Sequence, residues 1–323
     1  MIVVGGEALV DLVDEGGALR AVPGGGPFNT AVALGRLGLR VGYLGTISRD
    51  EYGVALAELL IEAGVEMSLV RFTNAPTPLA VVHKQDDGGN SYTFYLAGTA
   101  LADLPRRALP LLPVEAVALH VGTLALAVDP PAATFRALVE REAGLRAIIF
   151  DPNIRPAVFG DPDRYRPRFE RLARLATIVK MSGDDASWIY PGCDPSEIPE
   201  RVLALGPRIV AITLGSAGAI AASAMGRAQL PALPVVVADT VGSGDSFGAA
   251  FMAALHAHDA LELGSTRPLD DALLEKAVSY AVTAAAITST RTGAVPPSRA
   301  EIDACDPSRR LIAADQAQGY SSC

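Results

Sequence analysis

The amino-acid sequence predicts an α/β protein: a doubly wound, mostly parallel β-sheet with a smaller β-sheet attached to it. Short β-branched runs alternate with longer helical patterns over most of the 323 residues. This alternation predicts parallel strands covered by helices on both faces, and such sheets bind ligands at the carboxyl ends of their strands. Two hairpin patterns interrupt the alternation. Half of the residues are hydrophobic, which is enough for a large core.

The expected strands of the main sheet are short apolar runs rich in Val and Ile. They lie at residues 1–6, 41–45, 117–122, 147–151, 177–181 and 209–213. Several helical patterns between these strands are followed directly by glycine, which is a C-terminal stop signal. These helices are expected at residues 51–63, 134–143 and 198–205.

Two other stretches have the pattern of β-hairpins, because a glycine-containing turn separates two strand-like runs. Residues 8–22 turn at the Gly-Gly pair 16–17, and residues 77–97 turn at 87–89. The second arm of the later hairpin alternates, so that one of its faces carries Tyr92, Phe94 and Leu96. We expect the two hairpins to form one β lid over the ligand edge of the core. The alternative is surface decoration without a role.

This interpretation divides the chain into a core, a lid and a tail. The α/β core comprises residues 1–8, 25–71 and 98–304, the lid comprises 9–24 and 72–97, and a small, polar C-terminal tail comprises 305–323.

Composition favours a soluble cytoplasmic protein. The net charge is −9 without a block of like charges, which argues against a nucleic-acid partner. Three widely separated cysteines fit a reducing compartment, and the N-terminal residues lack the basic start of a signal peptide. The longest uncharged run, residues 209–226, contains Gly, Thr and Ser and has the pattern strand, turn, strand rather than that of a membrane span.

One stretch, "ADTVGSGDSFGAAF" at residues 238–251, combines small residues with a single acid, Asp245. A helix is expected to start near Ser246, which would place the amides of Gly242, Ser243 and Gly244 at its N-terminus. Free amides and the helix dipole together form an anion site there. A carboxylate beside them could accept a proton from a hydroxyl, an arrangement that suits phosphoryl transfer.

The same stretch also fits a purely structural role, because an acid at a helix start is a common capping residue. A dinucleotide fingerprint fits less well, since the glycines are one residue too widely spaced for it. The chain has no Gly-Lys-Ser/Thr P-loop. If the protein binds ATP, it therefore does so without that motif.

Two motifs make the chain resemble the PfkB, or ribokinase-like, family of small-molecule kinases. "DTVGSGDSFGAAFM" is similar to the C-terminal signature of that family, and "GGGPFNTAVALGRLG" to its N-terminal signature. The resemblance covers about residues 1–300. It implies a ribokinase-like fold with a β lid and an ATP-dependent sugar kinase activity.

The resemblance also implies roles for particular residues. Asp245 would be the general base, and the amides of Gly242, Ser243 and Gly244 would form the anion hole. Asp11 would hold sugar hydroxyls, since a carboxylate can accept two hydrogen bonds from a diol. The sugar pocket would also include Gly24, Gly25 and Asn29. Asp239, with nearby carbonyls and the turn at 293–294, would hold a monovalent cation, usually potassium.

The nucleotide site is implied in the same way. The loop "TLGSAG" resembles the family's nucleotide loop and would bring Thr213, Gly215 and Gly218 to ATP. Thr283, on an alanine-rich helix, would flank the adenine, although small residues there also suit close helix packing. Where the family commonly has Asn-x-x-Glu, this chain has Ser182 and Asp185, and a shorter acid can still organise magnesium through water.

Two strings bear on the substrate. "FDPNIRP", which contains Arg155, resembles fructokinases and 2-keto-3-deoxygluconate kinases, and "LHVGTLAL" resembles fructokinases. Arg155 is expected to contact a phosphate or a substrate carboxylate. Fructose is the expected acceptor. The alternatives are 2-keto-3-deoxygluconate, ribose or a nucleoside, or a non-catalytic sugar sensor. Lids in the family sometimes pair, which would make a homodimer.

Overall fold

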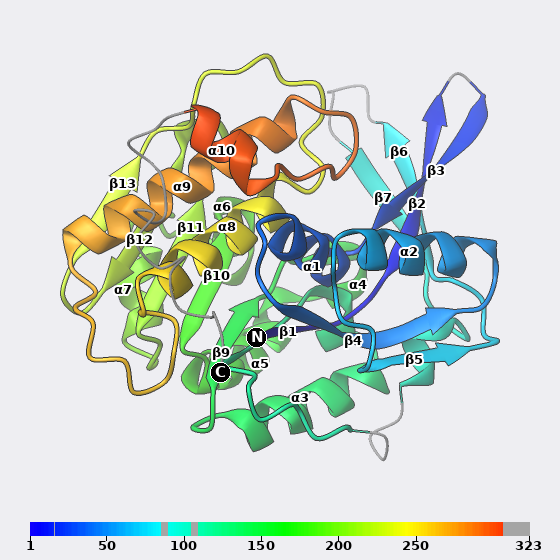
Figure 1. Cartoon of the computed structure of the whole chain (residues 1–323), viewed down its shortest axis with the longest axis horizontal. Helices are drawn as coiled ribbons and strands as arrows, with labels where there is room; N and C mark the ends of the chain where they lie inside the picture. The colour runs from blue at the N-terminus through cyan, green and yellow to red at the C-terminus, as the bar shows by residue number, and fades with distance from the viewer. Residues whose placement is uncertain (16, 85–89, 105–108, 306–323) are drawn as a thin grey trace, which may run out of the picture.

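The computed structural model describes residues 1–15, 17–84, 90–104 and 109–305. In these residues, nine strands form the main sheet. Their bounds are β1 Ile2–Gly5, β4 Val41–Ser48, β5 Val70–Thr73, β8 Ala118–Gly122, β9 Ala147–Asp151, β10 Ile178–Ser182, β11 Ile209–Thr213, β12 Ala219–Ser223 and β13 Arg227–Leu230. The strand order is β13-β12-β11-β10-β9-β8-β1-β4-β5 (Figure 1).

The main sheet is parallel from β5 through β11. Strand β12 pairs antiparallel with β11 and β13 pairs antiparallel with β12, so only β12 runs against the other strands. The six predicted strands are confirmed as β1, β4, β8, β9, β10 and β11. Residues 209–226 contain the expected strand, turn and strand, since β11 pairs with β12. The sequence therefore predicted the fold class correctly.

Helices cover both faces of this sheet (Figure 1). One face is covered by α1 Gly26–Arg36, α2 Glu51–Glu62, α8 Ser243–Ala257, α9 Asp271–Ser289 and α10 Arg299–Cys305. The other is covered by α3 Pro131–Glu142, α5 Pro162–Leu175, α6 Gly183–Ile189 and α7 Ile198–Leu203. Neighbouring strand residues point to opposite faces: Ile178 packs with the α8 layer, whereas Val179 and Met181 pack with the α5 layer.

The helix ends differ slightly from those expected. Helix α2 ends one residue early. Helix α3 begins three residues early, at Pro131, because proline fits the first turn of a helix, where its missing N–H has no partner to lose. Helix α7 ends two residues early, and the short helix α4, Pro156–Phe159, follows β9.

The two hairpins form one small sheet that stands away from the main one (Figure 1). Its strands are β2 Leu9–Glu15, β3 Ala18–Gly24, β6 Leu79–Lys84 and β7 Asn90–Tyr95. Their order is β3-β2-β6-β7, with β2 and β6 joined in parallel. The predicted turn residue 16, the turn at 87–89 and tail residues 306–323 lie outside the described residues.

One expected boundary falls inside a strand. Residue 72 was predicted to begin the second lid segment, but it belongs to β5, which pairs in parallel with β4 in the main sheet. The core therefore continues to Thr73 before the chain crosses to the lid.

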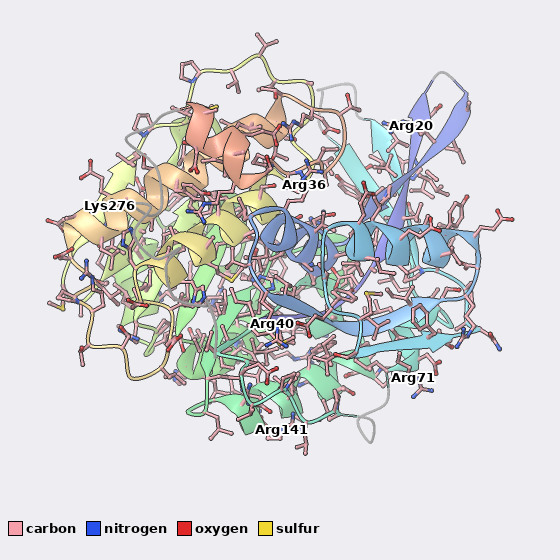
Figure 2. All side chains as sticks on the ribbon, viewed as in Figure 1. Arg20, Arg36, Arg40, Arg71, Arg141 and Lys276 are labelled. Carbon is pink, nitrogen blue, oxygen red and sulfur yellow. The ribbon has the colours of Figure 1, made fainter. Side chains whose placement is uncertain are left out.

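None of the helices in the described ranges is long and apolar enough to cross a membrane. The labelled basic side chains in Figure 2 lie on separate elements: Arg20 on β3, Arg71 on β5, Arg141 on α3 and Lys276 on α9. Positive charge at these positions is therefore distributed rather than gathered into one patch.

Candidate active site

The first turn of α8 is the centre of the site. The helix begins at Ser243, three residues earlier than expected, because Gly242 takes a left-handed conformation (φ 75°) that lets it precede the helix directly. A Cβ at Gly242 would lie 2.5 Å from the Cβ of Ala294, so only glycine fits without movement. Asp245 is consequently the third residue of the helix. Amides in this first turn have no intrahelical acceptor, and the helix dipole favours an anion beside them.

Asp245 is almost fully buried, with 8% of its surface exposed. Its Oδ2 accepts a hydrogen bond of 2.8 Å from Nδ2 of Asn29, on α1. Burial raises the pKa of Asp245 to about 6, while Lys180 and the hydrogen bond from Asn29 act in the opposite direction. A carboxyl group with this pKa is ionised at neutral pH and is suited to accept a proton.

A cavity of about 240 Å³ opens at Asp245. The lid contributes Leu9, Asp11, Tyr92 and Phe94 to it, and the core contributes Glu7, Asn29, Thr123, Asn153 and Arg155. Burial raises the pKa of Asp11 to about 6, although Arg155 lowers it. This end of the cavity thus has carboxylates and an amide placed where hydroxyl groups could bind, which suits a polyhydroxylated acceptor.

The glycines before α1 surround this cavity in different ways. Gly25 has φ 105°, and a Cβ there would lie 2.7 Å from the carbonyl oxygen of Glu7. Gly24 lies behind Asp11 rather than on the cavity surface, since a Cβ there would lie 2.4 Å from Asp11 Oδ2. Gly26, which was not predicted, lines the cavity, and a Cβ there would lie 2.6 Å from Cγ2 of Thr123.

A second, more apolar cavity of about 540 Å³ lies on the other side of the α8 N-terminus. The loop at 213–218 lines it through Thr213, Gly215, Ser216 and Gly218. The two cavities share three lining residues: Thr213, Thr240 and Gly244. The first turn of α8 therefore lies between an acceptor-sized space and a larger space with an apolar wall.

Residues 2–301 match the family described as pfkB family carbohydrate kinase. The chain belongs to this family. It is 36% identical over 279 residues to a fructokinase of Rhizobium leguminosarum bv. trifolii, covering 85% of each chain. It is 34% identical over 297 residues to a fructokinase of Klebsiella pneumoniae, covering 90% of this chain and 93% of that one. This protein is accordingly an ATP-dependent carbohydrate kinase.

Solved structures agree with this assignment. The fructokinase of Vibrio cholerae O395 with bound fructose, ADP and calcium superposes with a TM-score of 0.82 at 26% identity, covering 94% of this chain and 97% of that one. The aminoimidazole riboside kinase of Salmonella enterica superposes with a TM-score of 0.81 at 25% identity, covering 94% and 98%. The larger main sheet and the smaller lid sheet of this kinase are thus those of a ribokinase-like fold.

Thr283, which is expected beside the adenine, is not among the residues that line the larger cavity. Thr283 is fully buried, and its hydroxyl donates to the carbonyl oxygen of Ser279 within α9. The residues of α9 that line the larger cavity instead are Val282, Ala285, Ala286 and Ser289. Their spacing of three, four and seven residues defines one helix face, and residue 283 lies to the side of it.

Ser182 and Asp185 together cap α6. Ser182 Oγ accepts from the amide of Asp185, and Asp185 Oδ2 accepts from the amide of Ser182. Asp185 Oδ1 also accepts from the amide of Ile154, at 2.7 Å. Burial and the neighbouring Asp151 raise the pKa of Asp185. Both residues line the cavity of about 240 Å³ at Asp245, and their role in organising magnesium stays a prediction.

Asp239 ties two loops of the kinase together. Its Oδ1 accepts from the amide of Val241, and its Oδ2 accepts from the amide of Gly293 at 2.9 Å. A bound monovalent cation at this place stays a prediction.

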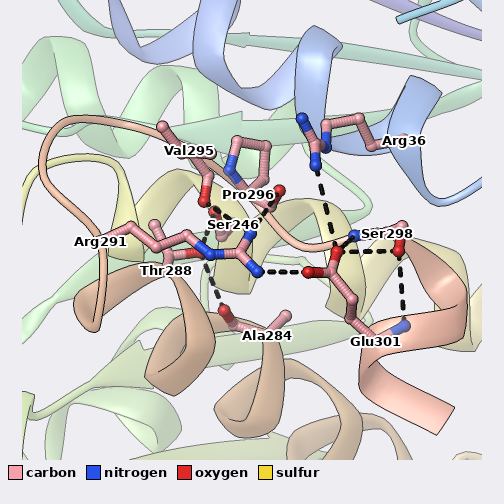
Figure 3. Close-up of polar contacts among 9 residues, drawn as sticks. All are labelled: Arg36, Ser246, Ala284, Thr288, Arg291, Val295, Pro296, Ser298 and Glu301. Atoms are coloured by element: carbon pink, nitrogen blue, oxygen red, sulfur yellow. Dashed lines mark hydrogen bonds and ion pairs between the residues drawn. The ribbon is translucent and has the colours of Figure 1, made fainter. Parts of the chain in front are cut away.

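A polar network holds the loop between α9 and α10 (Figure 3). Arg291 is paired with Glu301, and Glu301 also accepts from the amide of Ser298 at 2.7 Å. Beside it, Thr288 donates to Oγ of Ser246 at 2.8 Å, next to Asp245 in α8. Because this loop contains Ala294, the network fixes the surface against which Gly242 packs.

Two buried groups of the site were missed at the sequence level. Glu7 accepts from the hydroxyl of Thr123 and the amide of Ala125, and burial raises its pKa to about 7. Lys180 pairs with Asp151 at 2.7 Å beneath α8. Both residues could have been found from the sequence, because each is an ionisable residue within or just after an apolar strand. Such positions lie at the edge of the sheet where parallel strands end and ligands bind.

Proposed function

We propose that this kinase transfers the γ-phosphoryl group of ATP to a hydroxyl of fructose. The observation that carries the proposal is the place of Asp245. Asp245 lines the cavity of about 240 Å³, which we call the acceptor cavity. Its neighbour Gly244 lines both this cavity and the cavity of about 540 Å³, which we call the nucleotide cavity. A base between an acceptor and a nucleotide is the arrangement that in-line phosphoryl transfer requires.

The mechanism follows from the residues around Asp245. The sugar binds beneath the lid against Asp11, Asn29 and Asp245, and ATP binds along the loop at 213–218. Asp245 takes the proton of a primary alcohol while the alcohol oxygen forms a bond to the γ-phosphorus and the bond to ADP breaks. The amides of the first turn of α8, including those of Ser243 and Gly244, stabilise charge on the transferring group. The lid excludes water, which would otherwise accept the phosphoryl group.

Magnesium fits this arrangement. Oδ1 of Asp151 is buried without a hydrogen-bond partner among the described residues. The negative charge of Asp151 raises the pKa of Asp185, so the two carboxyl groups act on each other. Magnesium is usually held by one or two carboxylates, waters and substrate phosphates, which matches the absence of a larger ligand cluster in the described residues. Asp185 would hold the ion through water, and the ion would neutralise phosphate charge. Potassium at Asp239 and a homodimer formed through the lid stay predictions.

Fructose is supported by the charge of the acceptor end. Glu7 and Asp11 face one cation there, Arg155, whose Nη1 already donates to Oδ1 of Asn153 at 2.7 Å. A neutral ketose fits such surroundings better than a substrate with a carboxylate. The fructokinase names of the relatives point the same way. Arg155 is the observation that favours 2-keto-3-deoxygluconate as the second candidate. Use of ATP is consistent with the expected cytoplasmic location.

An ADP-release assay with fructose, 2-keto-3-deoxygluconate, ribose and nucleosides tests the proposal. The expected result is the highest kcat/KM with fructose. A higher value with the keto acid, ribose or a nucleoside would replace fructose with that acceptor. Sugar binding without ADP release would identify a sensor instead of an enzyme.

A further inference from the structure

A buried ammonium group lies directly beneath the first turn of α8. Lys180 is in β10 and shares the sheet face of Ile178, toward the α8 layer. Its Nζ lies 3.4 Å from the place that a Cβ of Gly244 would take, and its Cδ lies 3.9 Å from that of Gly248. These glycines are one helical turn apart, so the missing side chains leave a channel for the lysine.

The hydrogen bonds of this ammonium are incomplete. Lys180 has 5% of its surface exposed, and Nζ donates to Oδ2 of Asp151 at 2.7 Å. An ammonium group has three donors, and the other two have no hydrogen-bond acceptor among the residues that the structure describes. Buried donors without acceptors are costly, and a buried ion pair is not a reliable source of stability. The pair is therefore better explained by a group that binds next to it.

The position of Lys180 identifies that group. Its side chain lines the acceptor cavity together with Asp245 and Gly244, at the end that adjoins the nucleotide cavity. Three carboxylates interact with its charge, namely those of Asp151, Asp185 and Asp245. Burial alone would lower the pKa of Lys180, but these carboxylates outweigh burial and raise it, so the side chain stays charged.

We propose that Lys180 is a catalytic residue whose ammonium, oriented by Asp151, binds the phosphoryl group during its transfer from ATP to the acceptor. This inference rests on the kinase activity proposed above. The lysine donates from below the first turn of α8 while the backbone amides donate from the turn itself. It neither gives up nor receives a proton, so the proton of the acceptor still passes to Asp245.

Lys180→Met tests this role because methionine keeps the apolar stem and removes the charge. We expect kcat to fall on the order of 100-fold, as when one donor to a developing oxyanion is removed. Binding of ADP and of fructose, each measured alone, should change little. Lys276→Met is the matched control, because Lys276 is exposed on α9 at the edge of the molecule (Figure 2) and should leave kcat unchanged.

A double variant separates catalysis from folding. Lys180→Met alone leaves Asp151 buried and unpaired, which could impair folding by itself. Lys180→Met with Asp151→Asn removes both charges and should restore the melting temperature while kcat stays low. Full recovery of kcat in the double variant would overturn the proposal and make the pair structural.

Binding of a transition-state mimic gives an independent readout. In the presence of fructose, the wild-type enzyme should bind ADP more tightly with aluminium fluoride than without it. In the Lys180→Met enzyme, aluminium fluoride should no longer increase the affinity for ADP. If the Lys180→Met enzyme keeps the increased affinity and a near-normal kcat, the proposed role of Lys180 is contradicted, whereas the proposed kinase function is not. A wild-type enzyme that phosphorylates no sugar contradicts the proposed function and this inference with it.

Discussion

Asn29 and Asp245 are 216 residues apart in the sequence, yet Nδ2 of Asn29 donates a hydrogen bond of 2.8 Å to Oδ2 of Asp245. The bond joins the first turns of α1 and α8, and each of these helices follows a glycine with positive φ. It fixes one oxygen of the carboxylate and leaves Oδ1 on the side of Gly26, toward the acceptor cavity. The orientation of the predicted base therefore depends on two helix starts at once.

Asp245→Asn should abolish most of the turnover without disturbing the fold. An asparagine at 245 can still accept from Asn29, but it cannot take a proton. We expect kcat to fall by about 10²–10⁴-fold, the usual contribution of a general base. Steady-state kinetics and calorimetric nucleotide binding measure the two effects. The control Asp163→Asn alters a side chain that is 78% exposed and should leave kcat unchanged. Near-normal turnover by the Asp245→Asn enzyme would remove Asp245 as the base.

The pH dependence of turnover should report the same carboxylate. The pKa of Asp245 is about 6, so the base is ionised above pH 6 and protonated below it. Because this pKa is that of the free enzyme, kcat/KM for the sugar should rise with pH through about 6 and then level off. Asn29→Leu removes a donor that stabilises the ionised form, so it should move this rise to higher pH.

A matched substitution checks that shift. Asn74→Leu changes an exposed residue and should leave the profile in place. An identical profile for the Asn29→Leu enzyme would mean that another group limits turnover at low pH.

The sequence predicted the main sheet because buried parallel strands are apolar throughout, and their pattern is local. It located Asp245 and Asn29 through resemblance to known signatures. It could not pair Lys180 with Asp151, because nothing local in β10 or β9 indicates which strands are neighbours. For a related reason it could not show which face of α9 lines the larger cavity. Helix α9 is apolar on several sides, and Thr283 is buried to the side of the face that lines this cavity.

Two glycines of α8 should respond in opposite ways to alanine. Gly242→Ala places a side chain at φ 75° and 2.5 Å from Ala294, so it should destabilise the fold by about 1–2 kcal/mol or more and lower kcat. Gly248→Ala meets only Cδ of Lys180, at 3.9 Å, and should stabilise the helix by about 0.5–1 kcal/mol. Thermal unfolding followed by circular dichroism measures both. Equal melting temperatures for the two variants would contradict the assigned helix start.

Neighbouring aromatic residues on β7 test the lid. Phe94 lines the acceptor cavity and is stacked with Tyr92, whereas Tyr95 is 58% exposed on the opposite face of the strand. Phe94→Ala removes apolar surface that would cover the bound sugar, so KM for fructose should rise about tenfold. KM for ATP should not change, because the described lining of the nucleotide cavity contains no lid residue. Tyr95→Ala removes a similar ring from the same strand and should leave both constants unchanged. An equal rise of the fructose KM in both variants would mean that the lid acts through its stability rather than through contact with the sugar.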